Sequence, residues 1–180
     1  MQDVKIHDKV FTVMIEAKQI NERIKTLADS INTEYRDKKP LFLGVLNGAF
    51  LFAADLFKEI NIECEISFVK VSSYAGTESS GAVKNLIGIS HSIKDRHVIV
   101  LGDIVDTGDT ARYIIEELKR HETASIKFAT LLFKPKALKH NFRPDYSCFE
   151  IDPAFVVGFG LDYDGLGRNL NDIYVLKNNG

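Results

Sequence analysis

Short stretches made almost entirely of apolar residues are the feature that most restricts how this chain can fold. One covers residues 41–46 and another residues 98–101. A run this short and this apolar is typical of a strand that is covered on both faces. Around these runs helical and strand patterns alternate, and we expect helices at 49–58 and 110–120 and further strands at 63–71 and 126–133. The alternation predicts an α/β fold, a parallel sheet flanked by helices, in which ligands bind beyond the carboxyl ends of the strands.

The two ends of the chain differ from this pattern. Residues 16–35 carry apolar side chains three and four positions apart, which places them on one stripe of an amphipathic helix: Ile20, Ile24, Leu27, Ile31 and Tyr35. After Phe133 the pattern is irregular, with prolines between short apolar segments at 146–149, 155–157 and 173–176. We expect residues from about 134 to 180, with the N-terminal segment 10–15, to form a small C-terminal hood on the main sheet.

Composition limits the protein to a few classes. A chain of 180 residues with 45% hydrophobic and 27% charged residues is expected to fold as one globular domain, residues 1–180. The formal net charge of -2 gives no reason to expect a nucleic-acid or membrane partner. Residues 1–9 contain no apolar signal-peptide core, which predicts a cytoplasmic location. Cys64 and Cys148 stand among apolar neighbours, and we expect both to be buried free thiols.

Residues 97–114 carry the strongest chemical signal. An apolar strand is followed by acids, a glycine turn and the start of an amphipathic helix, and the stretch contains Asp103, Asp106, Thr107, Gly108, Asp109 and Thr110. Backbone N–H groups at such a turn form a concave array suited to a phosphate monoester, and threonine hydroxyls add donors. The two acids before the turn suit ribose hydroxyls, a magnesium ion or a developing cation. For an isolated Asp-Thr-Gly, simple helix capping would be the better interpretation.

The complete register of this stretch resembles the phosphoribosyl pyrophosphate motif of type I phosphoribosyltransferases. The resemblance implies the fold of that family. It also implies that the phosphoribosyl group is bound by Asp103, Asp106, Thr107, Gly108, Asp109 and Thr110. Asp106 would be the catalytic base that takes a proton from the purine ring, and Asp103 would hold ribose hydroxyls and magnesium.

Two further segments resemble parts of the family's active site, the pyrophosphate-binding loop and the mobile lid. Residues 46–49 resemble the family's first loop, in which Asn47 and Gly48 would grip pyrophosphate through backbone N–H groups and a cis peptide bond often occurs. Many relatives carry a basic residue where Asn47 stands. Ser73 and Tyr74 resemble the Ser-Tyr pair of the family's mobile lid. They lie in the serine- and glycine-rich stretch 72–85, which from composition alone is equally well interpreted as a disordered connector, and Tyr74 as a surface aromatic.

The C-terminal third resembles hypoxanthine and guanine phosphoribosyltransferases. Lys134 matches the lysine that donates to the purine's exocyclic oxygen, Phe155 would stack on the purine face, and Val156 would read the base edge through its backbone. Asp162, in the same purine-binding segment, would hold a second magnesium through water, and Arg168 would contact pyrophosphate. Without the resemblance, the lysine and the arginine would be solvated charges and the two apolar residues part of the core.

The resemblance implies purine salvage by a magnesium-dependent enzyme. It would transfer the phosphoribosyl group of phosphoribosyl pyrophosphate to hypoxanthine, a 6-oxopurine, and to guanine, giving IMP or GMP, as a homodimer or homotetramer. A xanthine- or guanine-preferring enzyme is the nearest alternative. A non-catalytic regulator of the same fold is another, but the joint presence of Asp106, Lys134, Asp162 and Arg168 argues against it. The fingerprints GxGxxG and GxxxxGK[ST] of other nucleotide-binding enzymes do not occur.

One position departs from the family pattern. Where most relatives carry adjacent glutamate and aspartate at the end of the strand, this chain has Gly102 and Asp103. The loss of one carboxylate should weaken the grip on phosphoribosyl pyrophosphate. Gly102→Glu should therefore lower the KM for this substrate if the backbone accepts a side chain there.

Overall fold

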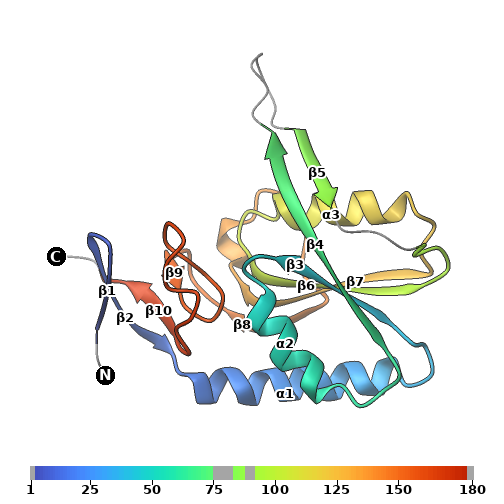
Figure 1. Ribbon diagram of the computed structural model, residues 1–180, viewed down its shortest axis with the longest axis horizontal. Helices are drawn as coiled ribbons and strands as arrows, with labels where there is room; N and C mark the ends of the chain where they lie inside the picture. The colour runs from blue at the N-terminus through green and yellow to red at the C-terminus, as the bar shows by residue number, and fades with distance from the viewer. Residues whose placement is uncertain (1–2, 75–82, 88–91, 178–180) are drawn as a thin grey trace.

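A six-stranded sheet forms the centre of the protein in the computed structural model, which describes residues 3–74, 83–87 and 92–177 (Figure 1). The strand order is β5-β4-β3-β6-β7-β8. The strands are β3 (Leu41–Leu46), β4 (Glu65–Tyr74), β5 (Val83–Ile87), β6 (His97–Val105), β7 (Ser125–Phe133) and β8 (Tyr146–Glu150). All neighbours pair in parallel except β5, which lies antiparallel to β4 at one edge. The predicted parallel sheet is confirmed.

Helices cover both faces of this sheet. Helices α1 (Ala17–Glu34) and α2 (Phe50–Glu59) lie on one face and α3 (Asp109–Lys119) on the other (Figure 1). In β6, Ile99 and Leu101 pack into the core on the side of α1 and α2, whereas Val98 and Val100 pack with α3. Both faces of the strand are therefore covered by other side chains and shielded from water, which explains why its sequence is an unbroken apolar run.

The described ends of the stretch 72–85, residues 72–74 and 83–85, are strands. Strand β4 continues to Tyr74, β5 begins at Val83, and the two pair antiparallel, so that they extend beyond the rest of the sheet as a ribbon (Figure 1). Residues 75–82 lie outside the described residues. The predicted end of the strand at residue 71 was wrong because backbone pairing in an edge ribbon does not require apolar side chains.

A second, four-stranded sheet brings the two ends of the chain together. Its order is β1-β2-β10-β9, all antiparallel, with β1 (Val4–Ile6), β2 (Lys9–Ile15), β9 (Val156–Val157) and β10 (Ile173–Leu176). We call this sheet the hood, and it contains the N-terminal strands β1 and β2 as well as the C-terminal strands β9 and β10. Its extent differs from the prediction of 134–180, because β8 belongs to the main sheet and the short 3-10 helix η1 (Pro135–Ala137) follows directly on β7.

Two smaller expectations have mixed outcomes. Both cysteines are free thiols, but only Cys148 is buried, while Cys64, just before β4, is partly exposed. Burial raises the pKa of the Cys148 thiol to about 12. No helix within the described part of the chain is long and apolar enough to cross a membrane.

Candidate active site

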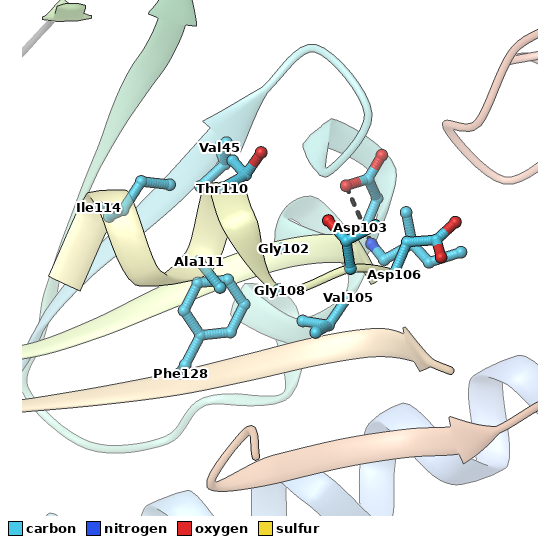
Figure 2. A pocket seen from close by; sticks show the side chains of 12 residues that line it. Val45, Gly102, Asp103, Val105, Asp106, Gly108, Thr110, Ala111, Ile114 and Phe128 are labelled. Atoms are coloured by element: carbon cyan, nitrogen blue, oxygen red, sulfur yellow. Dashed lines mark hydrogen bonds between the residues drawn. The ribbon is translucent and has the colours of Figure 1, made fainter. Parts of the chain in front are cut away.

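The site lies where the carboxyl ends of β3, β6 and β7 meet. A cavity of about 240 Å³ opens there, and its lining includes Asp103, Asp106, Thr107, Gly108 and Thr110 (Figure 2). Five of the six predicted phosphoribosyl-binding residues thus surround one space. Its floor is apolar, formed by Val45, Gly102, Ala111, Ile114 and Phe128. The sixth residue, Asp109, is not part of this lining and directs its side chain elsewhere.

The turn between β6 and α3 depends on Gly108. This residue has a φ of +84°, a left-handed conformation that glycine adopts without strain, and it stands immediately before the first residue of α3. The N-cap residue Gly108 has no side chain to bind the first N–H groups, and only the N–H of Asp109 makes a long contact, 3.4 Å, to the hydroxyl oxygen of Thr107. The first N–H groups of a helix have no partners within the helix and carry partial positive charge, so the turn is suited to an anion such as a phosphate.

Asp106 and Lys134 form an ion pair across the ends of β6 and β7. Lys134 Nζ donates to Asp106 Oδ2 at 2.7 Å. The lysine side chain is 9% exposed, whereas that of Asp106 is 49% exposed. The lysine backbone N–H also bonds the carbonyl of Val105, which anchors it to the strand end. The residues predicted as general base and purine reader are therefore direct neighbours, with the carboxylate facing the solvent side.

Asp103 is packed against the first loop. Its Oδ1 accepts the backbone N–H of Ile104 at 2.9 Å. A Cβ added to Gly48 would lie 1.6 Å from Asp103 Oδ2, and one added to Gly160 would lie 2.1 Å from the carbonyl oxygen of Gly48. Only glycines allow the first loop, the end of β6 and the hood to approach this closely. The Leu46–Asn47 peptide bond is cis, as the resemblance implied.

The environment of Asp103 alters its acidity. Burial raises the pKa of this carboxyl, while the backbone N–H groups of Ile104 and Asp103 and the charge of Arg168 oppose the rise. The charge of Asp162 adds to it. The two predicted metal ligands are therefore close enough to interact electrostatically, although they lie on the main sheet and in the hood.

Arg168 and Asp162 are held by each other. Arg168 Nη2 lies 2.7 Å from Asp162 Oδ1, and Arg168 Nη1 donates to the carbonyl of Gly160 at 2.7 Å. The other carboxylate oxygen of Asp162 accepts the N–H of Gly165 at 2.7 Å. The sequence assigned the two residues separate roles, and the structure adds that each orients the other. A guanidinium held in this way has donors left for an anion.

Phe155 and Val156 occupy contrasting environments in the hood. The Phe155 ring is one of the few large apolar side chains in the described structure that is exposed, at 44%, and it lies against Phe11 and Tyr163 with ring centroids 6.0 and 5.6 Å away. Val156 is buried and pairs with Val175 in β10. An exposed ring held by two aromatic neighbours can offer a face to a planar ligand.

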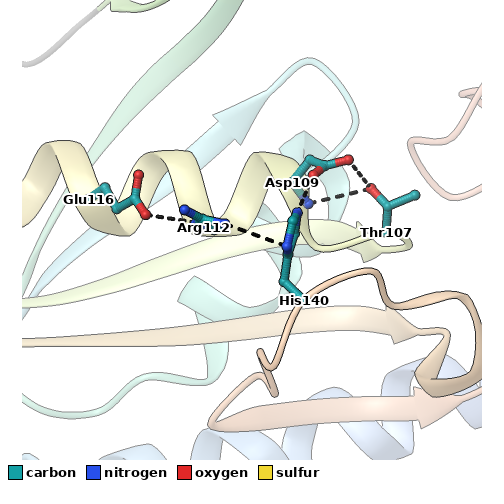
Figure 3. A network of polar contacts seen from close by, with 5 residues as sticks. All are labelled: Thr107, Asp109, Arg112, Glu116 and His140. Atoms are coloured by element: carbon teal, nitrogen blue, oxygen red, sulfur yellow. Dashed lines mark hydrogen bonds and ion pairs between the residues drawn. The ribbon is translucent and has the colours of Figure 1, made fainter.

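A polar network beside the phosphate turn was not foreseen from the sequence. His140 Nε2 lies 2.6 Å from Asp109 Oδ1, and the hydroxyl of Thr107 donates to Asp109 Oδ2 at 2.8 Å (Figure 3). The hydrogen bonds from Thr107 and His140 lower the pKa of the Asp109 carboxyl. His140 stands in an irregular segment far along the chain, and no spacing or motif pointed to it.

Gly102 is buried, and a side chain at this position would meet the ring of Phe128. A Cβ built there would lie 2.9 Å from Cε1 of Phe128, a ring that is itself buried against Phe142. The structure therefore does not meet the condition attached to Gly102→Glu unless Phe128 moves. Ser73 and Tyr74 lie at the end of β4, and their predicted lid role stays a prediction.

Asp103 and Asp162 suit a magnesium ion that is bound partly by substrate phosphates, and they do not form a metal site made by the protein alone. The described residues contain no cluster of three or more side chains that could hold a metal ion. Magnesium commonly binds through one or two carboxylates together with water and substrate phosphates. Asp103 and Asp162 supply the hard oxygen donors that this arrangement needs.

Comparison with known proteins agrees with this geometry. Residues 14–164 match the model of the phosphoribosyl transferase domain. The chain is 43% identical over 166 residues to a hypoxanthine-guanine phosphoribosyltransferase of Lactococcus lactis, covering 92% of this chain and 90% of the relative. It is 42% identical over 172 residues to one of Bacillus subtilis, covering 95% of each. A crystal structure of a hypoxanthine phosphoribosyltransferase from Staphylococcus aureus is similar with a TM-score of 0.83 at 36% identity, over 92% of this chain and 91% of that one. With its parallel sheet, its glycine turn between β6 and α3 and these relatives, the chain belongs to the phosphoribosyltransferase family.

Proposed function

We propose that the protein transfers the phosphoribosyl group of phosphoribosyl pyrophosphate to hypoxanthine and guanine, forming IMP or GMP and pyrophosphate in purine salvage. The observation that carries the proposal is the Asp106–Lys134 pair beside the phosphate turn. It sets a carboxylate that can accept a proton next to a cation that can bind a carbonyl oxygen. These are the two groups that a 6-oxopurine acceptor requires.

The acid-base step is assigned to Asp106. Its ion pair with Lys134 fixes the position of the carboxylate, and its partial exposure leaves one side open to a ligand. As the purine ring nitrogen forms its bond to the ribose carbon, its proton would pass to the carboxylate. Lys134 Nζ has three hydrogens, so that it can bind the aspartate and still donate to the purine's exocyclic oxygen. The purine face would stack on Phe155, and the backbone of Val156 would contact the base edge.

The charged ends of phosphoribosyl pyrophosphate are assigned to separate elements. The turn from Thr107 to Thr110 would hold the phosphate through backbone N–H groups and hydroxyls. Arg168, Asn47 and Gly48 would hold pyrophosphate. Asp103 and Asp162 would hold magnesium, which when bound offsets the negative charge of the leaving pyrophosphate. With the phosphate and the pyrophosphate both held, the ribose carbon is positioned so that the purine nitrogen can displace pyrophosphate from it.

The assay that tests the proposal measures nucleotide formation with each base in turn. The protein is incubated with magnesium, phosphoribosyl pyrophosphate and hypoxanthine, guanine, xanthine or adenine, and the products are separated chromatographically. We expect IMP and GMP, and little AMP, because a lysine donor suits a carbonyl and not an amino group. A preference for adenine, or no nucleotide from any base, would refute the assignment. A preference for xanthine would favour the alternative within the family. The homodimer or homotetramer and the cytoplasmic location stay predictions.

A further inference from the structure

The turn that would hold the phosphate contains a carboxylate of its own. Asp109 is the first residue of α3, two positions after Thr107 and next to Gly108. A negative charge near a helix N-terminus stabilises the free protein, but it also repels a bound phosphate. Binding of phosphoribosyl pyrophosphate therefore requires that this carboxylate be turned away from the phosphate and kept there.

The segment after η1 supplies the group that holds it. The N–H of Lys139 donates to the carbonyl of Thr107 at 3.0 Å, and the Leu138 side chain lies 3.2 Å from where a Cβ on Gly108 would be. This contact places His140 beside the start of α3, with Nε2 at 2.6 Å from Asp109 Oδ1 (Figure 3). The imidazole is about one third exposed. It is therefore held by its contacts without being part of the core.

Both ring nitrogens of His140 make contacts near the start of α3. An ionised carboxylate only accepts hydrogen bonds, so Nε2 must carry the hydrogen that is shared with Asp109. On the other side, Nδ1 lies 3.5 Å from Nη1 of Arg112. Arg112 is in turn fixed by Glu116, through a 2.7 Å contact between Nε and Oε1. The imidazole of His140 thus contacts both Arg112 and Asp109 in the first turn of α3.

We propose that His140 is a positioning residue for phosphoribosyl pyrophosphate. By binding Oδ1 of Asp109, it holds the carboxylate away from the phosphate even when the Thr107 hydroxyl turns from Asp109 Oδ2 to an incoming phosphate oxygen. Without the imidazole, Asp109 would keep only its hydrogen bond from Thr107, and the carboxylate would be free to rotate toward the phosphate once that bond is given up. The inference rests on the proposed function, since it concerns the substrate of that same site.

The test is a comparison of steady-state constants for His140→Ala and His140→Gln. We expect His140→Ala to raise the KM for phosphoribosyl pyrophosphate by about five- to twentyfold, with kcat and the hypoxanthine KM within about twofold of the unmodified protein. His140→Gln retains an N–H donor near the position of Nε2 and should recover most of the loss. His121→Ala, at an exposed histidine beyond the other end of α3, is the matched control.

A second variant decides whether His140 acts through Asp109. In an Asp109→Asn background the charge is gone, so adding His140→Ala should change the KM for phosphoribosyl pyrophosphate by less than about threefold. An equally large rise in that background, or an unchanged KM in His140→Ala alone, would overturn the inference. Calorimetric titration with phosphoribosyl pyrophosphate and magnesium in the absence of purine gives the same comparison as a Kd. Because this titration needs no turnover, failure of the inference can be told apart from failure of the proposed transferase activity.

Discussion

The contact between Gly102 and Phe128 can be tested through stability. Gly102→Ala adds one methyl group at the end of β6, at a point 2.9 Å from Cε1 and 3.0 Å from Cζ of the phenylalanine. Both distances are shorter than ordinary van der Waals contact. The ring is 3% exposed and packs edge-on against Phe142 with ring centroids 5.6 Å apart, so moving it disturbs this contact. The substitution should therefore overpack this part of the core.

The expected magnitude combines two opposing effects. Inserting a methyl group into a well-packed core typically costs about 1 to 3 kcal/mol. Replacing glycine also lowers the entropy of the unfolded chain, which offsets about 0.4 to 1 kcal/mol of that cost. We expect the free energy of unfolding to fall by about 1 to 2 kcal/mol. For a chain of this size the fall corresponds to a decrease in Tm of roughly 2 to 8 °C.

The assay is urea unfolding of four proteins: unmodified, Gly102→Ala, Phe128→Leu and the double variant. Leucine is shorter than phenylalanine and frees the space that the new methyl group needs. The free energy of unfolding of the double variant should therefore exceed, by at least about 1 kcal/mol, the value expected if the effects of the two single substitutions were added. The same logic applies to substrate binding. Gly102→Glu alone should not lower the KM for phosphoribosyl pyrophosphate, whereas Gly102→Glu with Phe128→Leu should lower it by roughly tenfold.

Additive effects of the two substitutions on stability would refute the packing argument, because residues that compete for one space cannot act independently. Tighter binding of phosphoribosyl pyrophosphate by Gly102→Glu with Phe128 intact would refute it as well. That result would mean that the ring moves at little cost.

Two further substitutions separate the roles of the central ion pair. Asp106→Asn should lower kcat by about 100- to 10,000-fold with little change in either KM, since its amide oxygen can still accept from Lys134 while the base is lost, and a retained kcat would remove Asp106 from the acid-base step. Lys134→Ala should raise the KM for hypoxanthine by roughly ten- to a hundredfold and weaken discrimination against adenine, as measured by kcat/KM for each base. An unchanged base preference would show that the lysine serves only to hold Asp106.

Much of the main sheet was predictable because its residues are constrained locally. The strand at 41–46 and the helix stripe of α1 were predicted almost to the residue, since a doubly covered strand and an amphipathic helix each leave a distinct pattern of apolar residues. The ribbon of β4 and β5 was missed because its polar residues resemble a loop. The four-stranded sheet starts later in the C-terminal part than the predicted residue 134, because β8 is short and its apolar pattern does not say which sheet it joins.

The sequence by itself determined which chemical groups are present: a strand, two acids, a glycine turn and a helix, followed by a lysine, an aromatic residue and an arginine in the remaining third. Only the tertiary structure decided which of these groups meet. The Asp106–Lys134 pair joins the ends of adjacent parallel strands, and Asp109 contacts His140, which lies 31 positions further along the chain. Such partners depend on strand order and on how a loop crosses a helix start. A local pattern of residues carries no information about either, because both are set by packing among segments that are remote in sequence.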